Sequence, residues 1–353
     1  MLPEQVIAAH RGAAENPPNR FEKVHLERDE DWNPEEDPLP RTQFLKDRSK
    51  SIIAYNDSPD IGFEASINPY RGCEHGCIYC YARPFHEYLG FSAGIDFETK
   101  IMVKENAPQL LRAELSSPKW KPQVIAISGV TDCYQPIERK MKITRGCLEV
   151  LAEFRNPVGI ITKNFLVTRD LDLLVELARH NAVQVHISLT TLDTELRKIM
   201  EPRTSPPAAR LEAIRRLSEA GVRVGILMAP IVPGLTDHEI PAVLDAAAKA
   251  GAKTAGHVTL RLPLAVAPLF EKWLETHFPD RKEKVLNRLR SMRDGKLYDS
   301  KWGQRMRGNG IFADQIDQLF DVARRKVGIA ERGGELSTAA FRRPGGAQLQ
   351  LFE

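Results

Sequence analysis

Three of the five cysteines, Cys73, Cys77 and Cys80, lie within eight residues of one another. The total of five is odd and the first residues do not resemble a secretion signal, so we do not expect a disulfide framework. Thiolates are soft ligands that suit iron–sulfur clusters or zinc. Three thiolates on one tight turn can each bind one iron of a cubane cluster and leave the fourth iron open for reaction. The spacing therefore predicts a 4Fe-4S centre.

A zinc knuckle is the alternative interpretation of these cysteines. Structural zinc is normally four-coordinate, so His75 or His86 would be the fourth ligand. Zinc sites of this kind usually join one C-x2-C pair to a second, distant pair. Cys133 and Cys147 are 14 residues apart and form no such pair. The alternative predicts a zinc-stabilised nucleic-acid-binding module without catalysis.

The elements that position the cysteines are expected from the pattern of β-branched and amphipathic segments. Six strands are predicted, at residues 64–69, 124–129, 158–163, 182–189, 222–230 and 254–262. The predicted helices lie at residues 78–88, 107–115, 144–154, 171–179, 207–220, 237–250 and 265–277. Gly221 and Gly251 follow two of these helices and are predicted C-caps. Such βα repeats form a doubly wound sheet or a barrel, and both place the chemistry at the carboxyl ends of the strands.

Four segments are expected along the chain. Residues 1–56 are rich in polar residues and proline and predict an extended, partly disordered arm. Residues 57–280 form the predicted core. Residues 281–330 form a basic helical extension with a final helix near 314–327, and residues 331–353 form a flexible tail.

No apolar run is long enough to cross a membrane, and we expect a cytoplasmic protein.

Positive charge is concentrated late in the chain. The net charge is only +3, yet residues 281–307 contain ten Lys and Arg against three acids. Residues 1–280 contain 34 basic and 38 acidic side chains. A basic segment on a slightly acidic body can follow a phosphate backbone, although a solvated helix face is also consistent with it.

The arrangement Cys-x3-Cys-x-Tyr-Cys after the first predicted strand resembles the signature of the radical S-adenosylmethionine (radical SAM) superfamily. The resemblance extends over roughly residues 60–280 and implies a partial (β/α)6 TIM-type barrel, an α/β fold. The Arg-Gly-Cys lead-in and the polar strand ends at 131–132, 162–164 and 187–189 are most similar to the spore-photoproduct-lyase-like branch.

The resemblance implies two cofactors, a 4Fe-4S cluster and S-adenosylmethionine. In the family, the open iron chelates the amino and carboxylate groups of S-adenosylmethionine. One electron, from a reductant protein such as flavodoxin or ferredoxin, then cleaves the sulfonium to a 5′-deoxyadenosyl radical, which takes a hydrogen atom from the substrate. The protein supplies orientation and a pocket that excludes water. A lyase-like radical enzyme is therefore implied, with its reaction unspecified.

The same resemblance implies several cofactor-binding residues. Tyr79 corresponds to an aromatic position that packs the adenine, although a core aromatic is the alternative. Thr131 and Asp132 follow a strand end, where short polar side chains bind the ribose or the methionine ammonium, or else cap a turn. Lys163 and Ser188 end the next two strands and match positions that contact S-adenosylmethionine.

Three further candidates come with structural alternatives. Arg203, expected at the cofactor, and Arg261, a catalytic candidate, could each hold a carboxylate or phosphate, or form a structural ion pair. In the resembled branch a cysteine donates hydrogen from a position that is Gly129 here. Cys133 could do so from a shifted position or be a small core residue. The thymine-dimer reaction is therefore not implied.

The end of the chain, Gln-Leu-Gln-Leu-Phe-Glu, resembles the peptide with which bacterial DNA polymerases and repair proteins bind the sliding clamp. Gln348 would use its amide, and Leu349, Leu351 and Phe352 would supply apolar contacts. The alternative is that these residues pack on the protein itself. With the basic segment, the tail favours a radical enzyme that acts on damaged or modified DNA, in DNA repair. A radical enzyme for RNA, a peptide or a small molecule is the competing hypothesis.

Overall fold

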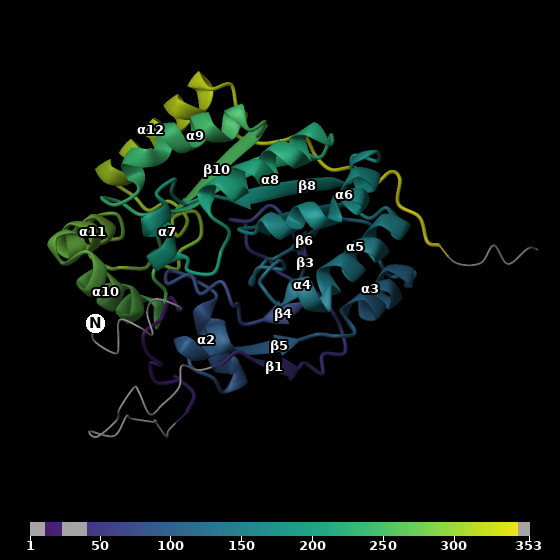
Figure 1. Ribbon diagram of the computed structural model, residues 1–353, viewed down its shortest axis with the longest axis horizontal. Coiled ribbons are helices and arrows are strands. Elements are labelled where there is room, and N and C mark those ends of the chain that lie inside the picture. Colours follow the sequence, from purple (N-terminus) through teal and green to yellow (C-terminus); the bar gives the residue numbers. More distant parts are fainter. Residues whose placement is uncertain (1–10, 23–40, 345–353) are drawn as a thin grey trace, which may run out of the picture.

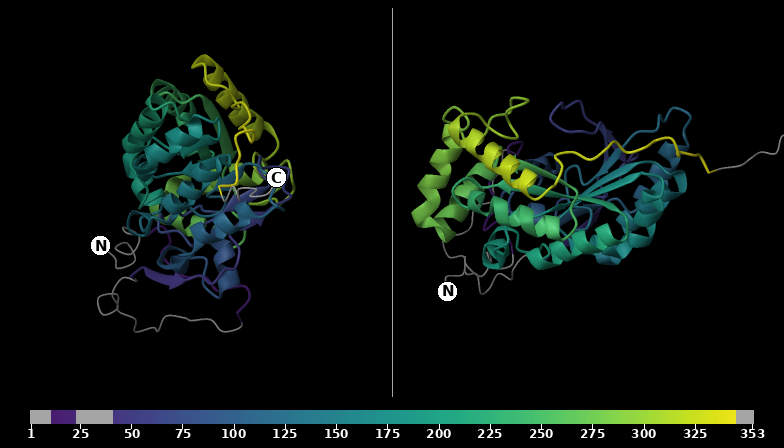
Figure 2. Two further views of the ribbon diagram at one scale, coloured as in Figure 1. Left: turned by 90° about the vertical axis from the view of Figure 1, so that its right-hand side faces the viewer. Right: turned by 90° about the horizontal axis from the view of Figure 1, so that it is seen from above.

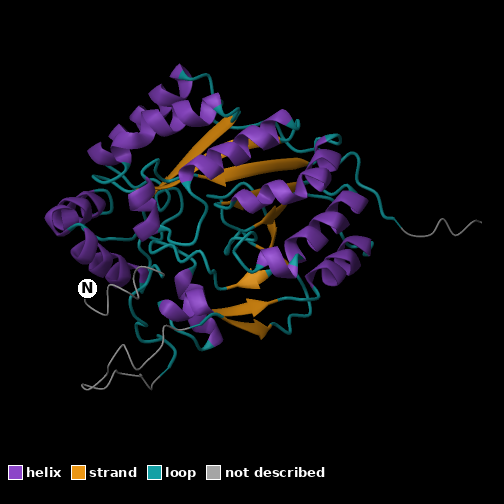
Figure 3. Ribbon diagram, viewed as in Figure 1, coloured by secondary structure: helices purple, strands orange, loops and turns teal. Residues whose placement is uncertain are grey.

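The structure is a computed structural model that describes residues 11–22 and 41–344. Its centre is a seven-stranded sheet with the order β10-β9-β8-β7-β6-β3-β2 (Figures 1 and 3). The six strands from β3 to β10 are parallel, and β2 pairs with β3 antiparallel. The strands of this sheet are β2 (Ile53–Tyr55), β3 (Ala65–Ile67), β6 (Ile125–Ile127), β7 (Val158–Thr162), β8 (Val183–Ser188), β9 (Arg223–Ile231) and β10 (Thr254–Thr259).

The order of the parallel strands decides between the two predicted topologies. Each strand of the β3-to-β10 series lies beside the next one in the sequence, without the reversal of a doubly wound sheet. Among the described residues β3 and β10 do not pair, so the sheet is open. The fold is the predicted α/β partial barrel, and all six predicted strands are confirmed to within a few residues.

Helices α5, α6, α8 and α9 lie along one face of this sheet (Figure 1). Their buried apolar side chains, such as Leu148, Leu174, Ile214 and Leu244, pack on alternate strand residues in one large core cluster. Gly221 and Gly251 have the positive φ expected of C-caps. The helices of the barrel are α3 (Ala107–Ser116), α4 (Glu138–Met141), α5 (Ile143–Phe154), α6 (Leu171–Ala178), α7 (Thr194–Met200), α8 (Pro207–Glu219), α9 (Ile240–Lys249) and α10 (Val266–His277), with 3-10 turns η1 (Arg83–Leu89), η2 (Phe165–Asp170) and η3 (Asp237–Glu239).

The described parts of the expected arm, within residues 1–56, include two short strands that pair with the rest of the protein. β1 (Gln43–Lys46) pairs in parallel with β5 (Lys100–Val103), which also pairs with β4 (Tyr70–Arg71), while β2 extends the main sheet. Residues 11–22 bind beside the cysteines and the short helix α2 (Ile95–Thr99), for example through the backbone N–H groups of Gly12 and Ala13, which donate to Glu98. Backbone pairing, which polar sequences can supply, holds these described segments on the body of the protein.

The predicted C-terminal extension consists of α11 (Pro279–Ser291) and α12 (Ile311–Lys326), and α12 packs beside α9 and β10 (Figure 1). The described part of the tail, up to residue 344, contacts the body of the protein. Arg342 donates backbone and side-chain hydrogen bonds to carbonyls at the end of α5, and Arg343 donates to the Trp120 carbonyl. Figure 2 shows this segment crossing the surface as an extended strap. No helix in the described part of the chain is long and apolar enough to span a membrane.

Candidate active site at the cysteine loop

The cysteine loop runs from β4 to η1, and its shape depends on two glycines. Gly72 and Gly76 both have left-handed φ, at +80° and +67°. A Cβ atom on Gly76 would lie 2.6 Å from an oxygen of Glu98. The backbone N–H of Cys73 donates to the Phe97 carbonyl at 2.9 Å, which fixes the start of the loop on α2. Strands β8 and β10 point toward the side of the molecule where α7, α10 and α11 lie (Figure 1). The cysteine loop reaches the end of α7, because the backbone N–H of Ile78 donates to the Met200 carbonyl at 3.1 Å.

Arg83 holds the loop from inside and was not anticipated from the sequence. Its guanidinium is fully buried, donates twice to the Cys77 carbonyl at 3.0 and 2.9 Å, and forms an ion pair with the buried Glu98. It also donates to the carbonyls of Ala93 and Gly94. The planar guanidinium therefore fastens several turns of irregular backbone to one another. The sequence feature that could have indicated this role is the position of Arg83, three residues after the last cysteine of the motif.

The three thiols form an electrostatically coupled group. Burial raises the pKa of Cys73, and the neighbouring Asp132, Cys77 and Cys80 raise it further. Burial also raises the pKa of Cys80, while Arg83, Lys163 and Arg261 act in the opposite direction. Cations around a thiol stabilise its thiolate, which is the form that binds metal. The donor set and its charged surroundings therefore suit a thiolate-bound cluster.

Asp132 is a structural centre at the carboxyl end of β6. Its carboxylate accepts from Thr162 Oγ1 and the Lys163 backbone, each at 2.8 Å, and lies 3.3 Å from His75 Nδ1. Burial alone would raise the pKa of Asp132, but His75 and the backbone donors of Lys163 and Tyr134 lower it to about 2. Asp132 thus stays ionised and joins the cysteine loop to β7. Its oxygens are engaged by protein donors, and its role in cofactor binding stays a prediction.

Lys163 and Ser188 were predicted separately and the structure brings them together. The Nζ atom of Lys163 donates to Ser188 Oγ at 2.8 Å, and it lies 5.8 Å from the centre of the Tyr79 ring. Ser188 also donates to the Ala229 carbonyl at 3.3 Å. Lys163 lowers the pKa of Cys77 against the dominant effect of burial, so the ammonium lies near the thiols. An ammonium group held next to the cysteines, with donor positions beyond the one used by Ser188, is suited to a carboxylate ligand.

Tyr79 belongs to a buried polar network that the sequence analysis missed. Its hydroxyl donates to Glu201, which also accepts from Thr190 Oγ1 at 2.8 Å and forms an ion pair with Arg210. Burial raises the pKa of the Tyr79 hydroxyl, and the charge of Glu201 raises it further. Glu201 lies 122 residues from Tyr79 in the chain. Arg203, two residues after Glu201, lies outside this network and pairs with Glu74 instead.

Thr131 and Arg203 are used structurally in this structure. Thr131 is buried and its hydroxyl donates to the Tyr70 carbonyl at 2.7 Å, which joins the segment after β6 to β4. Arg203 forms an ion pair with Glu74 at 3.0 Å, which favours the structural ion pair proposed as its alternative. Both contacts fix residues that flank Cys73.

Cys133 is fully buried in the main core cluster, with Tyr134, Cys147 and Leu148. Burial raises the pKa of its thiol, and Asp132 raises it further. A buried, protonated thiol packed among aliphatic side chains behaves as a small apolar residue. The structure therefore favours the core alternative over a hydrogen donor.

Arg261 lies at the carboxyl end of β10 with a second arginine nearby. Its guanidinium lies over the Tyr81 ring, 4.4 Å from the ring centre, and it forms no ion pair with the described residues. Arg293 is 2% exposed, and none of its three guanidinium nitrogens has a hydrogen-bond partner in the described chain. Burial, together with the charge of Arg261, lowers the pKa of Arg293 to about 10. Unpartnered buried donors are rare and usually have a functional reason.

The radical SAM superfamily model matches residues 67–247, a little over half of the chain, and includes the whole cysteine loop. The chain belongs to the radical SAM superfamily. Members of this superfamily are enzymes, and their cofactors are a 4Fe-4S cluster and S-adenosylmethionine.

The chain is also similar to other proteins in sequence and in structure. An uncharacterised protein of Mycobacterium tuberculosis is 38% identical over 220 residues, which are 62% of this chain and 65% of that protein. An uncharacterised protein of Methanocaldococcus jannaschii is 31% identical over 199 residues, 56% of this chain and 71% of that protein. This radical SAM protein thus spans about two thirds of the length of its mycobacterial relative. A structure of spore photoproduct lyase complexed with dinucleoside spore photoproduct covers 82% of this chain and 81% of that chain, with a TM-score of 0.57 and 16% identity, which shows a common fold.

The residues of the loop fit the family's cluster better than a zinc ion. His75, a proposed fourth zinc ligand, is engaged by Asp132 on one nitrogen and by Asn164 at 3.2 Å on the other. His86 is buried between Phe91 and Phe97.

Proposed function

We propose that this radical SAM enzyme abstracts a hydrogen atom from damaged or modified DNA, in a DNA repair reaction. The observation that carries the proposal is the pair Arg261 and Arg293, two neighbouring guanidinium groups that form no ion pair in the described chain. Arg261 lies near Cys80 of the cysteine loop. Guanidinium groups bind phosphate with two parallel hydrogen bonds. A phosphate of the substrate would satisfy donors that the protein itself leaves unpaired.

The chain's own residues have separate roles in this proposal. Cys73, Cys77 and Cys80 hold the cluster, which, when bound, supplies the electron that cleaves S-adenosylmethionine to a 5′-deoxyadenosyl radical. Lys163 and Ser188 orient the carboxylate end of S-adenosylmethionine, and the buried Tyr79 closes the pocket against water. Arg261 and Arg293 position the substrate. The electron would come from a reductant protein such as flavodoxin or ferredoxin.

Two further observations support DNA as the substrate class. The fold is similar to that of spore photoproduct lyase, one of whose structures holds a dinucleoside photoproduct. The basic segment 281–307 forms α11 and the loop that contains Arg293. The lesion itself is not specified, because the same scaffold supports many reactions. A substrate of RNA, peptide or a small molecule is the competing proposal.

The test is an anaerobic assay of the reconstituted and dithionite-reduced protein. We expect oligodeoxynucleotides that contain oxidised, alkylated or ultraviolet-damaged bases to increase 5′-deoxyadenosine formation, with Cys77→Ala as the inactive control. RNA of the same sequence and undamaged DNA are the comparison substrates. Stimulation by RNA alone, or by no nucleic acid, would sink the DNA proposal while leaving the radical chemistry intact.

We also propose that the C-terminal peptide binds the sliding clamp. The residues of this peptide, Gln348, Leu349, Leu351 and Phe352, lie outside the described residues. The proposal that they bind the clamp therefore rests on the sequence motif alone. The described chain ends at Pro344, on the strap that runs along the amino ends of the strands. A clamp bound beyond this point would leave the carboxyl edge free for DNA. Purified clamp should bind the full chain and not a truncation that lacks residues 348–353; equal binding would overturn this proposal.

A further inference from the structure

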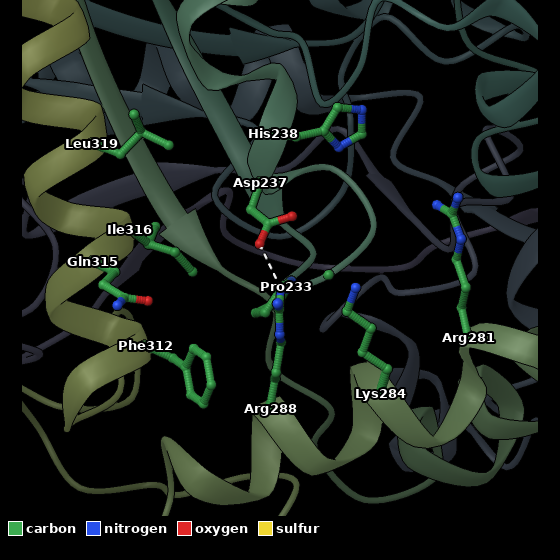
Figure 4. A pocket seen from close by; sticks show the side chains of 11 residues that line it. Pro233, Asp237, His238, Arg281, Lys284, Arg288, Phe312, Gln315, Ile316 and Leu319 are labelled. Atoms are coloured by element: carbon green, nitrogen blue, oxygen red, sulfur yellow. Dashed lines mark hydrogen bonds and ion pairs between the residues drawn. The ribbon is translucent and has the colours of Figure 1, made fainter.

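A cleft of about 570 Å³ lies between α11, α12 and the segment after β9, separate from the cysteine loop (Figure 4). One wall is cationic, because Arg281, Lys284 and Arg288 follow one another at helical spacing along one side of α11. The opposite wall is mostly apolar and comes from α12. Its side chains in the cleft are Phe312, Gln315, Ile316 and Leu319.

Two of the three cations are available for a ligand. Arg288 forms an ion pair with Asp237 at 2.9 Å, and its guanidinium lies 5.2 Å from the centre of the Phe312 ring. Arg281 and Lys284 are exposed and have no ion-pair partner among the described residues. Because Asp237 is neutralised by Arg288, the cleft keeps the positive charge of these two side chains. It therefore attracts anions.

The apolar wall limits the kind of anion. Phe312 is 38% exposed and Leu319 is 39% exposed, so both offer uncovered apolar surface beside the cations. An unpaired nucleotide has a phosphate on one side and a flat base on the other, which matches a cleft with one cationic and one apolar wall. A base-paired duplex presents phosphates but keeps its bases stacked inside. Single-strand-binding proteins combine a cationic groove with aromatic platforms in this way.

The cleft is linked to the active site through α11. The buried face of that helix, Val285, Leu286 and Leu289, packs in the same apolar cluster as Cys77 and Tyr79. The cations of the cleft lie on the adjacent face of the same helix. A strand bound there would lie one helix away from the cysteine-bearing core.

We infer that this cleft binds an unpaired stretch of nucleic acid, with phosphates on Arg281 and Lys284 and a base against Phe312. The inference rests on the proposed nucleic-acid substrate and deepens it, because it specifies a locally single-stranded form. A reaction on a base is only accessible when that base leaves the duplex stack. The cleft would hold the flanking nucleotides of an opened site.

The test measures binding to the full chain, independent of turnover. A fluorescein-labelled single-stranded DNA oligonucleotide and its duplex are titrated and followed by anisotropy. The charge variant is Arg281→Glu/Lys284→Glu, with Arg139→Glu/Lys140→Glu as the matched control, since these two exposed residues of α4 lie elsewhere and change the net charge equally. The stacking variant is Phe312→Ala, with Val322→Ala, an exposed residue of α12 outside the cleft, as its control.

We expect tighter binding to the single strand than to the duplex in the wild type. The charge variant should bind the single strand at least tenfold more weakly. It should also lower the slope of log Kd against log salt by about 1.4, because each of the two lost phosphate contacts contributes about 0.7 to that slope. Phe312→Ala should weaken binding about tenfold. Both control variants should bind like the wild type.

Three outcomes would overturn the inference. The first is that both cleft variants bind the oligonucleotide as tightly as the wild type does. The second is that the duplex binds as tightly as the single strand and Phe312→Ala has no effect. The third is that polyglutamate of equal charge displaces the oligonucleotide. The last would indicate an acidic protein partner. Binding that fits the inference, combined with a lack of stimulation by damaged DNA in the turnover assay, would reject the proposed reaction and keep the cleft.

Discussion

The Nζ atom of Lys163 lies 2.8 Å from Ser188 Oγ, and the two residues end neighbouring strands of the barrel, β7 and β8. Lys163 therefore has a defined position although its ammonium lies close to Glu201, Tyr79 and the thiol of Cys77. Such a fixed cation beside the cluster ligands is a preorganised site for a carboxylate.

Replacement of Lys163 by Met should weaken S-adenosylmethionine binding by tenfold or more, because a charge-assisted hydrogen bond contributes about 1.5–3 kcal/mol. Ser188→Ala should have a smaller effect, since the ammonium remains. Equilibrium dialysis of the reconstituted protein measures the affinity, and iron content shows whether the cluster is retained. Lys140→Met, at an exposed position of α4, is the control. Unchanged affinity in Lys163→Met would exclude a role for this cation in cofactor binding.

Single replacements of Cys73, Cys77 or Cys80 by Ala should each lower the iron content after reconstitution and abolish 5′-deoxyadenosine formation, because each thiolate is expected to bind a different iron. Cys147→Ala is the matched control, since that thiol is fully buried in the main core. Cys133→Ala should also retain 5′-deoxyadenosine formation. Full iron loading of a variant in the cysteine loop would contradict the assignment of that cysteine.

The strands of the barrel could be predicted because most are short runs that contain Val, Ile or Thr and are largely buried, which is a local signal. β1 was missed because most of its side chains are exposed and it is stabilised by pairing with β5, more than 50 residues away. Pairing partners at that separation leave no local pattern in a single sequence.

The candidate site was predictable to the extent that its residues are close in sequence or end a strand. The three cysteines form a local motif, and Lys163 and Ser188 follow apolar strands. Glu201 and Arg210 could not be found in this way, because their role depends on contacts with Tyr79 and with the backbone of Ser188. Arg203 was chosen instead for its charge, although its partner is Glu74.

His86 should make the stability of the protein depend on pH. Burial lowers the pKa of this imidazole from 6.5 to about 4, so the unfolded chain binds the proton more tightly than the folded one. The contribution of the neutral imidazole is therefore complete above pH 6.5 and is lost as the pH falls from 6.5 toward 4. Between pH 7 and pH 5 the free energy of unfolding should fall by about 2 kcal/mol from this residue.

Urea unfolding at pH 7 and pH 5 measures this contribution in the wild type and in His86→Phe. Phenylalanine suits the aromatic contacts with Phe91 and Phe97 and has no proton to gain. The variant should lose about 2 kcal/mol less stability between the two pH values than the wild type does. The same loss in both proteins would assign the pH dependence to other groups.

The buried Arg293 should lower the stability of the folded protein, and we expect it to be kept for substrate binding. Its buried guanidinium has no hydrogen-bond partner in the described chain and lies near the like charge of Arg261. Replacement of a buried charge by an apolar residue of similar volume is often neutral or stabilising, by about 1–4 kcal/mol. Arg293→Met should therefore melt at the same temperature as the wild type or higher, as scanning calorimetry can measure.

The same variant should lose its response to substrate. If Arg293 binds a phosphate of the substrate, Arg293→Met should show at least tenfold less stimulation of 5′-deoxyadenosine formation by damaged DNA, with the unstimulated rate unchanged. Lys296→Met removes an exposed charge three residues further along and should keep the full stimulation. A variant that is destabilised by several kcal/mol would show that Arg293 has a structural partner. One that responds normally to DNA would remove Arg293 from the substrate site, because its charge would then be dispensable for the reaction.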